Sequence, residues 1–313
     1  MPLISHEIPK ALFNRHDEVS DYPYVLGHLL SLDTEYADFY KEKLKTADYS
    51  ILDNSAFELG RSIPMEELYK LGKEYKPTHL VLPDVVNNYD QTLSNAKEYL
   101  ANYKVEEQKY IGVCQGDTFE QIADCIDYYL TEKVDIIALP FDLVEKSDYV
   151  TVRFRFLNWW YENRFNMGIG LPKFHLLGCQ NPVEFILINN LSTALRGLIY
   201  SLDTSSPVIN GWAGNELGPH GLTVPKPKAK LADNLDIELT KEQINLIFKN
   251  IKNNLRIIKS AVIIFSITFL VIFLLKNIIV SSCLIYPPSC RLQFEIGRQG
   301  SSCYSLNTEC NVV

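Results

Sequence analysis

The sequence predicts an α/β fold, a (β/α)8 barrel of the TIM type, on two observations. Short, continuous apolar runs alternate with amphipathic helical segments, at intervals of roughly 25 to 40 residues. Such runs suit strands that are buried on both faces of a parallel sheet. Six of these units, with room for one or two more before residue 50, favour a closed barrel over an open doubly wound sheet. No Gly-x-Gly-x-x-Gly motif follows the first clear strand, which weakens the dinucleotide-binding alternative.

The elements follow in order along the chain. Residues 24–30 suit either a strand or a helix start, and residues 35–45 suit an amphipathic surface helix. Strands are expected at residues 49–53, 79–83, 110–114, 135–140, 174–178 and 197–203, and helices at 64–75, 89–103, 119–132, 151–163 and 182–190. Residues 208–235, rich in Gly, Pro, Asn and Lys, are expected to form a long loop. Thr240, with Gln243 three residues later, predicts a last helix that runs to about residue 259.

Composition limits the class of protein. The chain has 313 residues, 47% of them hydrophobic, which is enough for one large domain or two small ones with a substantial core. Its net charge of −8 argues against binding to nucleic acid by bulk charge, although a local basic groove stays compatible with it. Residues 1–15 carry charge and proline without an apolar core, so no signal peptide is expected. Cys114, Cys125 and Cys179 lie in apolar segments and suit reduced core residues of a cytoplasmic protein.

The C-terminal part differs from the rest. Residues 260–280 are apolar enough to be either a membrane span or a buried tail extension. The basic residues before them would keep the main domain in the cytoplasm. Residues 281–313 contain four cysteines. They would form disulfides if the tail crosses a membrane, and otherwise they have no expected role. We therefore divide the chain into a barrel domain (1–259), an apolar segment (260–280) and a cysteine-containing tail (281–313).

Most of the predicted strands end on a polar or backbone group suited to chemistry. The ends of parallel strands meet on one face of a barrel, so these groups are expected to surround one site. Three carboxylates and an amide suit acid/base or nucleophilic work on a polar heterocycle. Each residue alone would be an ordinary turn or cap residue, and it is their recurrence that indicates a site. The set comprises Asp53, Asp84, Gln115, the backbone at Leu139, Gly178 and Asp203.

The ordered set resembles the guanine transglycosylases, which exchange guanine in tRNA or DNA for a 7-deazaguanine. Residues 52–58 (Leu-Asp-Asn-Ser-Ala-Phe-Glu) are similar to the family's Asp-Ser-Gly-Gly-Phe-Gln stretch, and residues 112–116 (Gly-Val-Cys-Gln-Gly) to its Val-Gln-Gly segment. Residues 175–178 resemble its Leu-Met-Gly strand, and residues 201–204 its Phe-Asp segment. The match covers about residues 50–207.

The resemblance implies a role for each residue. Asp203 would attack the anomeric carbon and hold the sugar covalently, and Asp53 would be the general acid and base. Asp84 and Gln115 would bind the edge of the base, helped by Phe57, Gly178 and the backbone at Leu139. The implied partners are DNA or tRNA and a free 7-deazaguanine, with no cofactor and no metal. A base bound in this way must be single-stranded or flipped out.

The chain also departs from the family. Its structural zinc site, three cysteines and a histidine, has no counterpart before residue 260, which favours DNA, as in phage-type relatives, over tRNA. The rivals are the same exchange on tRNA, a small-nucleoside hydrolase, and a catalytically silent barrel that binds nucleic acid or a membrane. His175 is expected to be a satisfied core histidine, and Trp159 and Trp160 to pack a helix on the barrel. Lys226, Lys228 and Lys230 are a solvated run or phosphate contacts.

Overall fold

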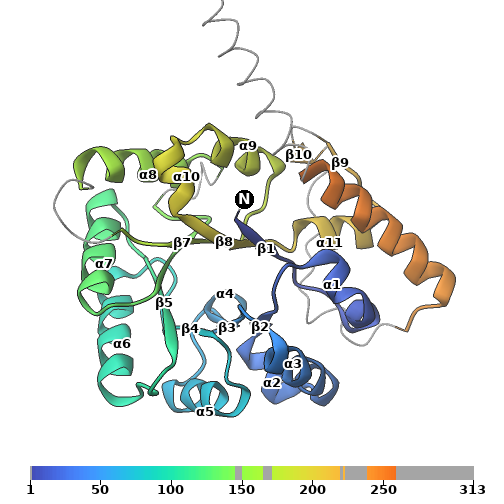
Figure 1. The fold of residues 1–313 in the computed structure, drawn as a ribbon, viewed down its shortest axis with the longest axis horizontal. Helices are drawn as coiled ribbons and strands as arrows, with labels where there is room; N and C mark the ends of the chain where they lie inside the picture. Colours follow the sequence, from blue (N-terminus) through green and yellow to red (C-terminus); the bar gives the residue numbers. More distant parts are fainter. Residues whose placement is uncertain (1, 145–149, 165–170, 219–220, 223–237, 259–313) are drawn as a thin grey trace, which may run out of the picture. The chain divides into compact units, whose positions relative to one another are not determined.

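Eight parallel strands form one sheet that curls into a nearly closed barrel in the computed structural model (Figure 1). The structure describes residues 2–144, 150–164, 171–218, 221–222 and 238–258. The strands are β1 (Leu3–Ser5), β2 (Tyr24–Leu26), β3 (Ile51–Asp53), β4 (His79–Val81), β5 (Lys109–Val113), β6 (Ile136–Pro140), β7 (Phe174–Leu177) and β8 (Ile199–Asp203). The predicted barrel is thus confirmed, with six strands at the predicted places and two before residue 50.

Helices surround this barrel in Figure 1, where the strands lie at the centre. Residues 24–30, which suited a strand or a helix, contain both, because β2 ends at Leu26 and a helix begins at Gly27. The helices are η1 (Lys10–Arg15), α1 (His16–Val19), α2 (Gly27–Leu32), α3 (Thr34–Thr46), α4 (Ala56–Leu59), α5 (Met65–Tyr75), α6 (Tyr89–Asn102), α7 (Phe119–Thr131), α8 (Val152–Asn163), α9 (Pro182–Asn190), α10 (Thr193–Leu198) and α11 (Ser206–Trp212).

The sheet order explains where the barrel is least regular. The order is β1-β8-β7-β6-β5-β4-β3-β2, so β1 and β2 are the two edges that face each other. The segment before β2 bridges them: Asp21 donates its N–H to the carbonyl oxygen of Ile4 at 2.8 Å, and Ile4 donates its own to Asp21 Oδ2 at 2.9 Å. Ser5 Oγ donates to the carbonyl oxygen of Tyr22 at 2.7 Å. We call this contact the β1/β2 seam.

The core lies between the sheet and the helices. Every residue of β6 is buried, as are Leu68 and Leu71 of α5, which the helical pattern placed on one face. Trp160 packs edge-on against Phe174 of β7, so this tryptophan belongs to the packing of α8 on the barrel, as predicted. The three described cysteines are buried and unpaired by disulfides, which agrees with the prediction of reduced core residues.

The long loop predicted for residues 208–235 is wrong in its first part. Here the chain forms α11 and the short strands β9 (Leu217–Gly218) and β10 (Gly221–Leu222). A helix over residues 241–258 packs against α11, and a Cβ at Gly211 would lie 2.6 Å from the backbone nitrogen of Ile251. The glycine that suggested a loop therefore permits a close helix–helix approach.

The start of the last helix was predicted correctly. Thr240 Oγ1 accepts the N–H of Gln243 at 3.3 Å, and Gln243 Oε1 accepts the N–H of Thr240 at 2.8 Å, which is the predicted reciprocal cap. Within the described ranges, no helix has both the length and the apolar character that a membrane span requires. The apolar segment at 260–280, the tail at 281–313 and the lysines at 226, 228 and 230 lie outside the described residues.

Candidate active site

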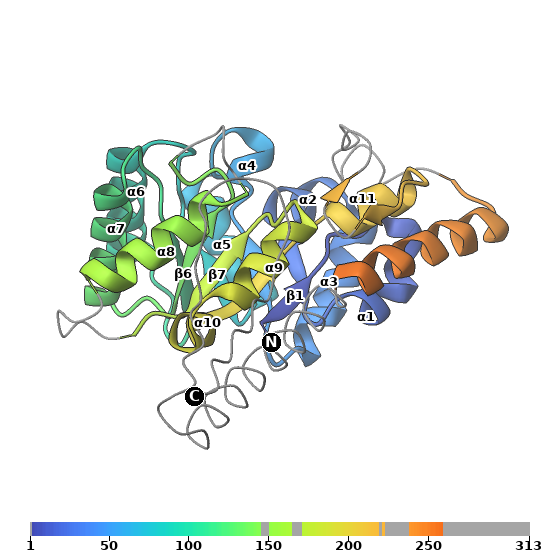
Figure 2. The same ribbon diagram turned by 90° about the horizontal axis from the view of Figure 1, so that it is seen from above.

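The predicted acids and amide gather at the carboxyl ends of the strands. Asp53 and Asp203 are the last residues of β3 and β8, whereas Asp84 and Gln115 stand in the loops just after β4 and β5. All four side chains are buried, with 3 to 7% of each residue exposed. Figure 2 shows α4, which follows β3, and α11, which follows β8, toward the same end of the barrel. The parallel sheet thus places these polar groups along one edge.

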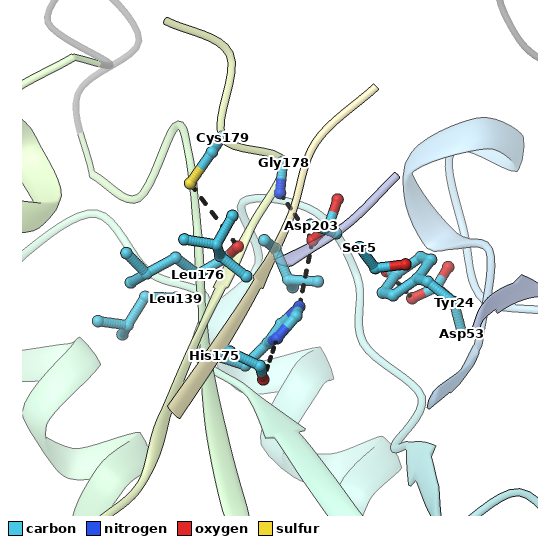
Figure 3. Close-up of polar contacts among 12 residues, drawn as sticks. Ser5, Tyr24, Asp53, Leu139, His175, Leu176, Gly178, Cys179 and Asp203 are labelled. Carbon is cyan, nitrogen blue, oxygen red and sulfur yellow. Dashed lines mark hydrogen bonds and ion pairs between the residues drawn. The ribbon is translucent and has the colours of Figure 1, made fainter. Parts of the chain in front are cut away.

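Asp203 is held through one of its two carboxylate oxygens (Figure 3). Its Oδ1 accepts the backbone N–H of Gly178 at 3.0 Å and lies 3.1 Å from Nε2 of His175. Its backbone carbonyl accepts the N–H of Cys179 at 2.9 Å, which fixes the end of β8 to the turn after β7. Among the described residues, none makes a hydrogen bond to Oδ2. Asp203 is therefore firmly oriented and still has an oxygen free to react.

Asp53 has both of its oxygens occupied. Oδ1 accepts the hydroxyl hydrogen of Tyr24 at 2.9 Å, and Oδ2 accepts the N–H of Ser55 at 2.7 Å. Burial, reinforced by the negative charge of Glu58, raises the pKa of Asp53 well above its usual value of 3.8. A carboxyl group in such surroundings favours its neutral form, which is the form that a general acid needs.

The loop after Asp53 is strained in a way that serves this geometry. Ser55 has a φ of 62°, in the left-handed region that a residue with a side chain seldom occupies. In this conformation its N–H bonds to Asp53 and its Oγ accepts the N–H of His28 at 3.1 Å. A glycine at position 27 is also required, because a Cβ there would lie 2.7 Å from the carbonyl oxygen of Asp53. Strain of this kind is common at functional sites.

Asp84 and Gln115 come together as predicted, but they bind each other. Gln115 Nε2 donates to Asp84 Oδ2 at 2.7 Å, and Asn54 Nδ2 donates to Asp84 Oδ1 at 2.7 Å. Gln115 Oε1 also accepts the N–H of Asn87 at 3.0 Å. Burial raises the pKa of Asp84. Each carboxylate oxygen keeps a second lone pair, so the edge of a base would share Asp84 with the two amides.

Tyr24 connects the Asp53 side of the site to the Asp203 side. Its hydroxyl bonds to Asp53, and its ring lies almost parallel to that of His175, with 6.1 Å between centroids and 12° between planes. Burial, and then the charges of Asp53 and Asp203, raises the pKa of Tyr24 well above 10. Tyr24 therefore stays protonated and remains a hydrogen-bond donor.

The other predicted site residues lie on the same side of the barrel. Phe57 is 61% exposed on α4 and contacts Phe141 edge-on, with ring centroids 5.8 Å apart. Gly178 has a φ of 65°, and a Cβ there would come within 3.3 Å of the Phe141 ring. Leu139 is fully buried, and its carbonyl oxygen already accepts a hydrogen bond from Arg153 Nη1 at 3.1 Å.

Arg153 was not singled out from the sequence, although it contacts the turn after β7 that bonds to Asp203. It is wholly buried on α8, pairs with the equally buried Glu184 of α9, and donates from Nη1 to the carbonyl oxygen of Leu177 at 2.8 Å. Its Nη2 lies 3.3 Å from Cys179 Sγ. Arg153 thus braces the turn at Gly178 and Cys179, which in turn holds Asp203. Its local pattern gave no signal, because its partner is 31 residues away.

The prediction that His175 is a satisfied core histidine is confirmed, since both ring nitrogens have partners. One partner, however, is Asp203, and the other is Ser201 Oγ at 2.8 Å. The sequence alone did not indicate these contacts, because they depend on how β7 pairs with β8. Ser201 and Asp203 are two residues apart on β8, so their side chains lie on the same face of the sheet. His175 on β7 pairs with Ser201 in the register of the two strands.

A metal site is not apparent in the part of the chain that the structure describes, where no three His, Cys, Asp or Glu side chains gather closely enough to hold an ion. Comparisons of the sequence with protein families and with curated proteins give no match.

Two solved structures are similar in shape to this chain. One is a phosphoenolpyruvate phosphomutase from Streptomyces platensis subsp. rosaceus, with 9% identity, a TM-score of 0.40, and coverage of 65% of this chain and 76% of that one. The other is a triosephosphate isomerase from Bartonella henselae, with 11% identity, a TM-score of 0.34, and coverage of 65% and 92%. Similarity at this level identifies neither an activity nor a substrate. The fold class rests on the strand order of this chain itself, a (β/α)8 barrel.

Proposed function

We propose that this protein is a guanine transglycosylase that exchanges guanine in DNA for a 7-deazaguanine base, through a covalent bond between Asp203 and the sugar. The observation that carries the proposal is the unequal environment of two carboxyl groups. Asp203 is anchored at Oδ1 and has no hydrogen-bond partner at Oδ2 within the described part of the chain, whereas Asp53 has a raised pKa and one partner on each oxygen. Carboxyl groups in such contrasting environments suit a nucleophile and a proton donor.

The exchange balances with these two groups alone. Asp203 Oδ2 forms a bond to the anomeric carbon as the bond from that carbon to the base nitrogen breaks. The leaving guanine takes that electron pair and accepts the proton of Asp53. In the second half the Asp53 carboxylate removes a proton from the incoming base. Its nitrogen then displaces Asp203 from the sugar, and both carboxyl groups return to their starting forms.

The remaining predicted residues fit binding of a base. Asp84 and Gln115 supply acceptor and donor groups for the polar edge of guanine, and the exposed ring of Phe57 offers a face for stacking. We infer DNA as the polymer because the cysteine and histidine cluster of the tRNA enzymes has no counterpart before residue 260. The base would have to leave the stack to reach the buried acids.

The test is incorporation of labelled guanine into DNA and into tRNA by the full chain and by its Asp203→Asn variant. We expect incorporation into DNA by the wild type and a loss of about 10³-fold or more in the variant, because a covalent step is removed. Asp117→Asn, at an exposed acid just beyond Gln115, is the matched control and should keep full activity. Trapping of a protein–DNA adduct on a denaturing gel should likewise require Asp203.

Two outcomes would count against this assignment. Incorporation into tRNA alone would keep the chemistry and replace the polymer. No incorporation into either polymer by folded protein, together with release of base from free nucleosides, would favour a small-nucleoside hydrolase. If base release is also absent, a silent barrel is the better description.

A further inference from the structure

We infer that a column of hydrogen bonds inside the barrel, formed by Tyr49, Ser201 and His175, positions Asp203 so that only its Oδ2 faces the reacting sugar. This inference deepens the proposed function and depends on it for the role of Asp203. The three residues are positioning residues, since the fully buried His175 reaches the site only through the carboxylate. We call them the barrel column.

The column is continuous over three short contacts. The hydroxyl of Tyr49, just before β3, lies 2.7 Å from Ser201 Oγ in the middle of β8. Ser201 Oγ lies 2.8 Å from His175 Nδ1, and His175 Nε2 lies 3.1 Å from Asp203 Oδ1. Ser201 and His175 are completely buried, and Tyr49 is nearly so. Figure 3 shows the upper end of the column, with the His175 ring aimed at Asp203.

Counting hydrogens gives the column one direction. If Tyr49 donates to Ser201, then Ser201 donates to Nδ1 of His175, and a neutral His175 donates from Nε2 to Asp203, so every hydrogen has an acceptor. In the opposite direction two acceptors would face each other at Nε2 and Oδ1. Burial raises the pKa of Tyr49, so its hydrogen is not lost at neutral pH.

The position of the column argues for a role beyond folding. Interiors of barrels of this type are usually filled by layers of bulky branched side chains, which have no polar groups that need hydrogen-bond partners. A polar column in that place is costly unless each group is satisfied, and it fixes a single arrangement when each group is. Here that arrangement ends on the carboxylate proposed as the nucleophile, where Gly178 supplies the second donor to the same oxygen.

The consequence is control over which oxygen attacks. Two N–H donors hold Oδ1, and the carboxylate cannot rotate without breaking both hydrogen bonds. Without the hydroxyl of Ser201 as a donor to Nδ1, His175 could adopt its other tautomer, in which Nε2 carries no hydrogen and repels Oδ1 of Asp203. The carboxylate would then sample other orientations, which slows the chemical step without weakening binding of the polymer.

The experiment combines nitrogen-15 NMR of the His175 ring with steady-state exchange kinetics, on the full chain and four variants. We expect a neutral ring protonated at Nε2 in the wild type and a mixture of tautomers in Ser201→Ala. We also expect kcat to fall by about tenfold in Ser201→Ala with an unchanged KM, and by less in Tyr49→Phe. His175→Gln, which keeps a donor, should retain more activity than His175→Leu.

Ser50→Ala is the matched control, because it removes another fully buried serine hydroxyl, one that bonds to Thr78 rather than to the column. It should change neither the tautomer of His175 nor kcat. A ring protonated at Nδ1, a doubly protonated ring, or an unchanged tautomer in Ser201→Ala would overturn the inference. Because the NMR measurement needs no substrate, it also separates failure of the column from failure of the proposed activity.

Discussion

The Asp53–Asp84 side and the Asp203 side of the barrel hold their carboxyl groups in opposite ways. On the first side all four oxygens of the two acids are occupied, by Tyr24, Ser55, Asn54 and Gln115. On the second side one oxygen of Asp203 takes two donors and the other takes none from the described residues. On the first side the surroundings favour the neutral form of an aspartate whose oxygens both have partners. On the second side they orient an aspartate through one oxygen and leave the other oxygen accessible to a ligand. The difference teaches that hydrogen-bond partners, more than position on a strand, assign the roles.

The largest effect is expected from the support of the Asp203 side. Arg153→Met leaves the fully buried Glu184 without its ion-pair partner, so the free energy of unfolding should fall by about 3–5 kcal/mol. Urea unfolding measures this change. Arg164→Met is the matched control, because this arginine contacts Asp127 nearer the surface and should cost about 1 kcal/mol or less. A double variant, Arg153→Met with Glu184→Gln, should regain part of the loss, because glutamine removes the buried charge and its oxygen can still accept the N–H groups of Gln180 and Asn181. An equal loss in both arginine variants would contradict the argument.

The next effect tests the neutral carboxyl group on the other side. Asp53→Asn should lower exchange by about 10²–10⁴-fold, because the amide cannot transfer the proton. Because the folded-state pKa of Asp53 is raised, its stabilising contribution is present at low pH and is lost as the pH rises from 3.8 through the raised value. The variant should therefore gain stability relative to the wild type as the pH increases. A variant that loses stability relative to the wild type as the pH increases, measured by urea unfolding, would mean that the pKa of Asp53 is not raised.

A smaller effect is expected where Asp84 is shared. Asn54→Ala removes hydrogen bonds to Leu82 and Asp84, of 2.6 and 2.7 Å, so the free energy of unfolding should fall by about 1–3 kcal/mol. It also frees Asp84 Oδ1, so the KM for the incoming base should decrease while kcat stays the same. Asn95→Ala, on the surface of α6, is the control. A higher KM in Asn54→Ala would show that Asn54 itself binds the base.

The smallest effect is expected at Phe57. Phe57→Ala should leave the unfolding free energy unchanged within about 0.5 kcal/mol, because the ring is 61% exposed. The KM for the base should nevertheless rise by about tenfold, since stacking of a base on an aromatic ring contributes about 1–3 kcal/mol. Leu32→Ala, at a leucine that is 76% exposed, is the control and should change neither quantity. An unchanged KM in Phe57→Ala would remove Phe57 from the site.

The fold was predictable because its signals are local. An apolar run such as residues 136–140 predicts a buried strand without reference to the rest of the chain. Thr240 and Gln243 likewise predict the start of a helix within four residues. β1 is harder, because its apolar part is only Leu3 and Ile4, between a proline and the polar residues that follow. The helix α11 was missed because its glycine at 211 is used for packing against Ile251, which a loop signal does not distinguish.

The strand-end acids of the candidate site were predictable for the same reason, but their environments were not. Nothing near Asp203 in the sequence shows that His175 and Gly178 take one of its oxygens. Nothing near Asp84 in the sequence shows that Asn54, 30 residues earlier, donates a hydrogen bond to one of the Asp84 oxygens. Arg153 looks like an ordinary helix-surface arginine until Glu184 is placed beside it. Contacts between neighbouring strands and helices decide these environments, and such contacts exist only in the folded chain.

The β1/β2 seam has a consequence for how the protein is made. β1 has one ladder partner among the described strands, β8, and the contact from His6 to Thr204 at their ends spans 198 residues. At about 5–20 residues per second, synthesis of those 198 residues takes about 10–40 s, during which β1 has no partner to join. Closing so long a loop is a slow, late event in folding. Asp203 is the last residue of β8, so a nascent chain lacks the residue proposed as the nucleophile until the last strand of its barrel has been made.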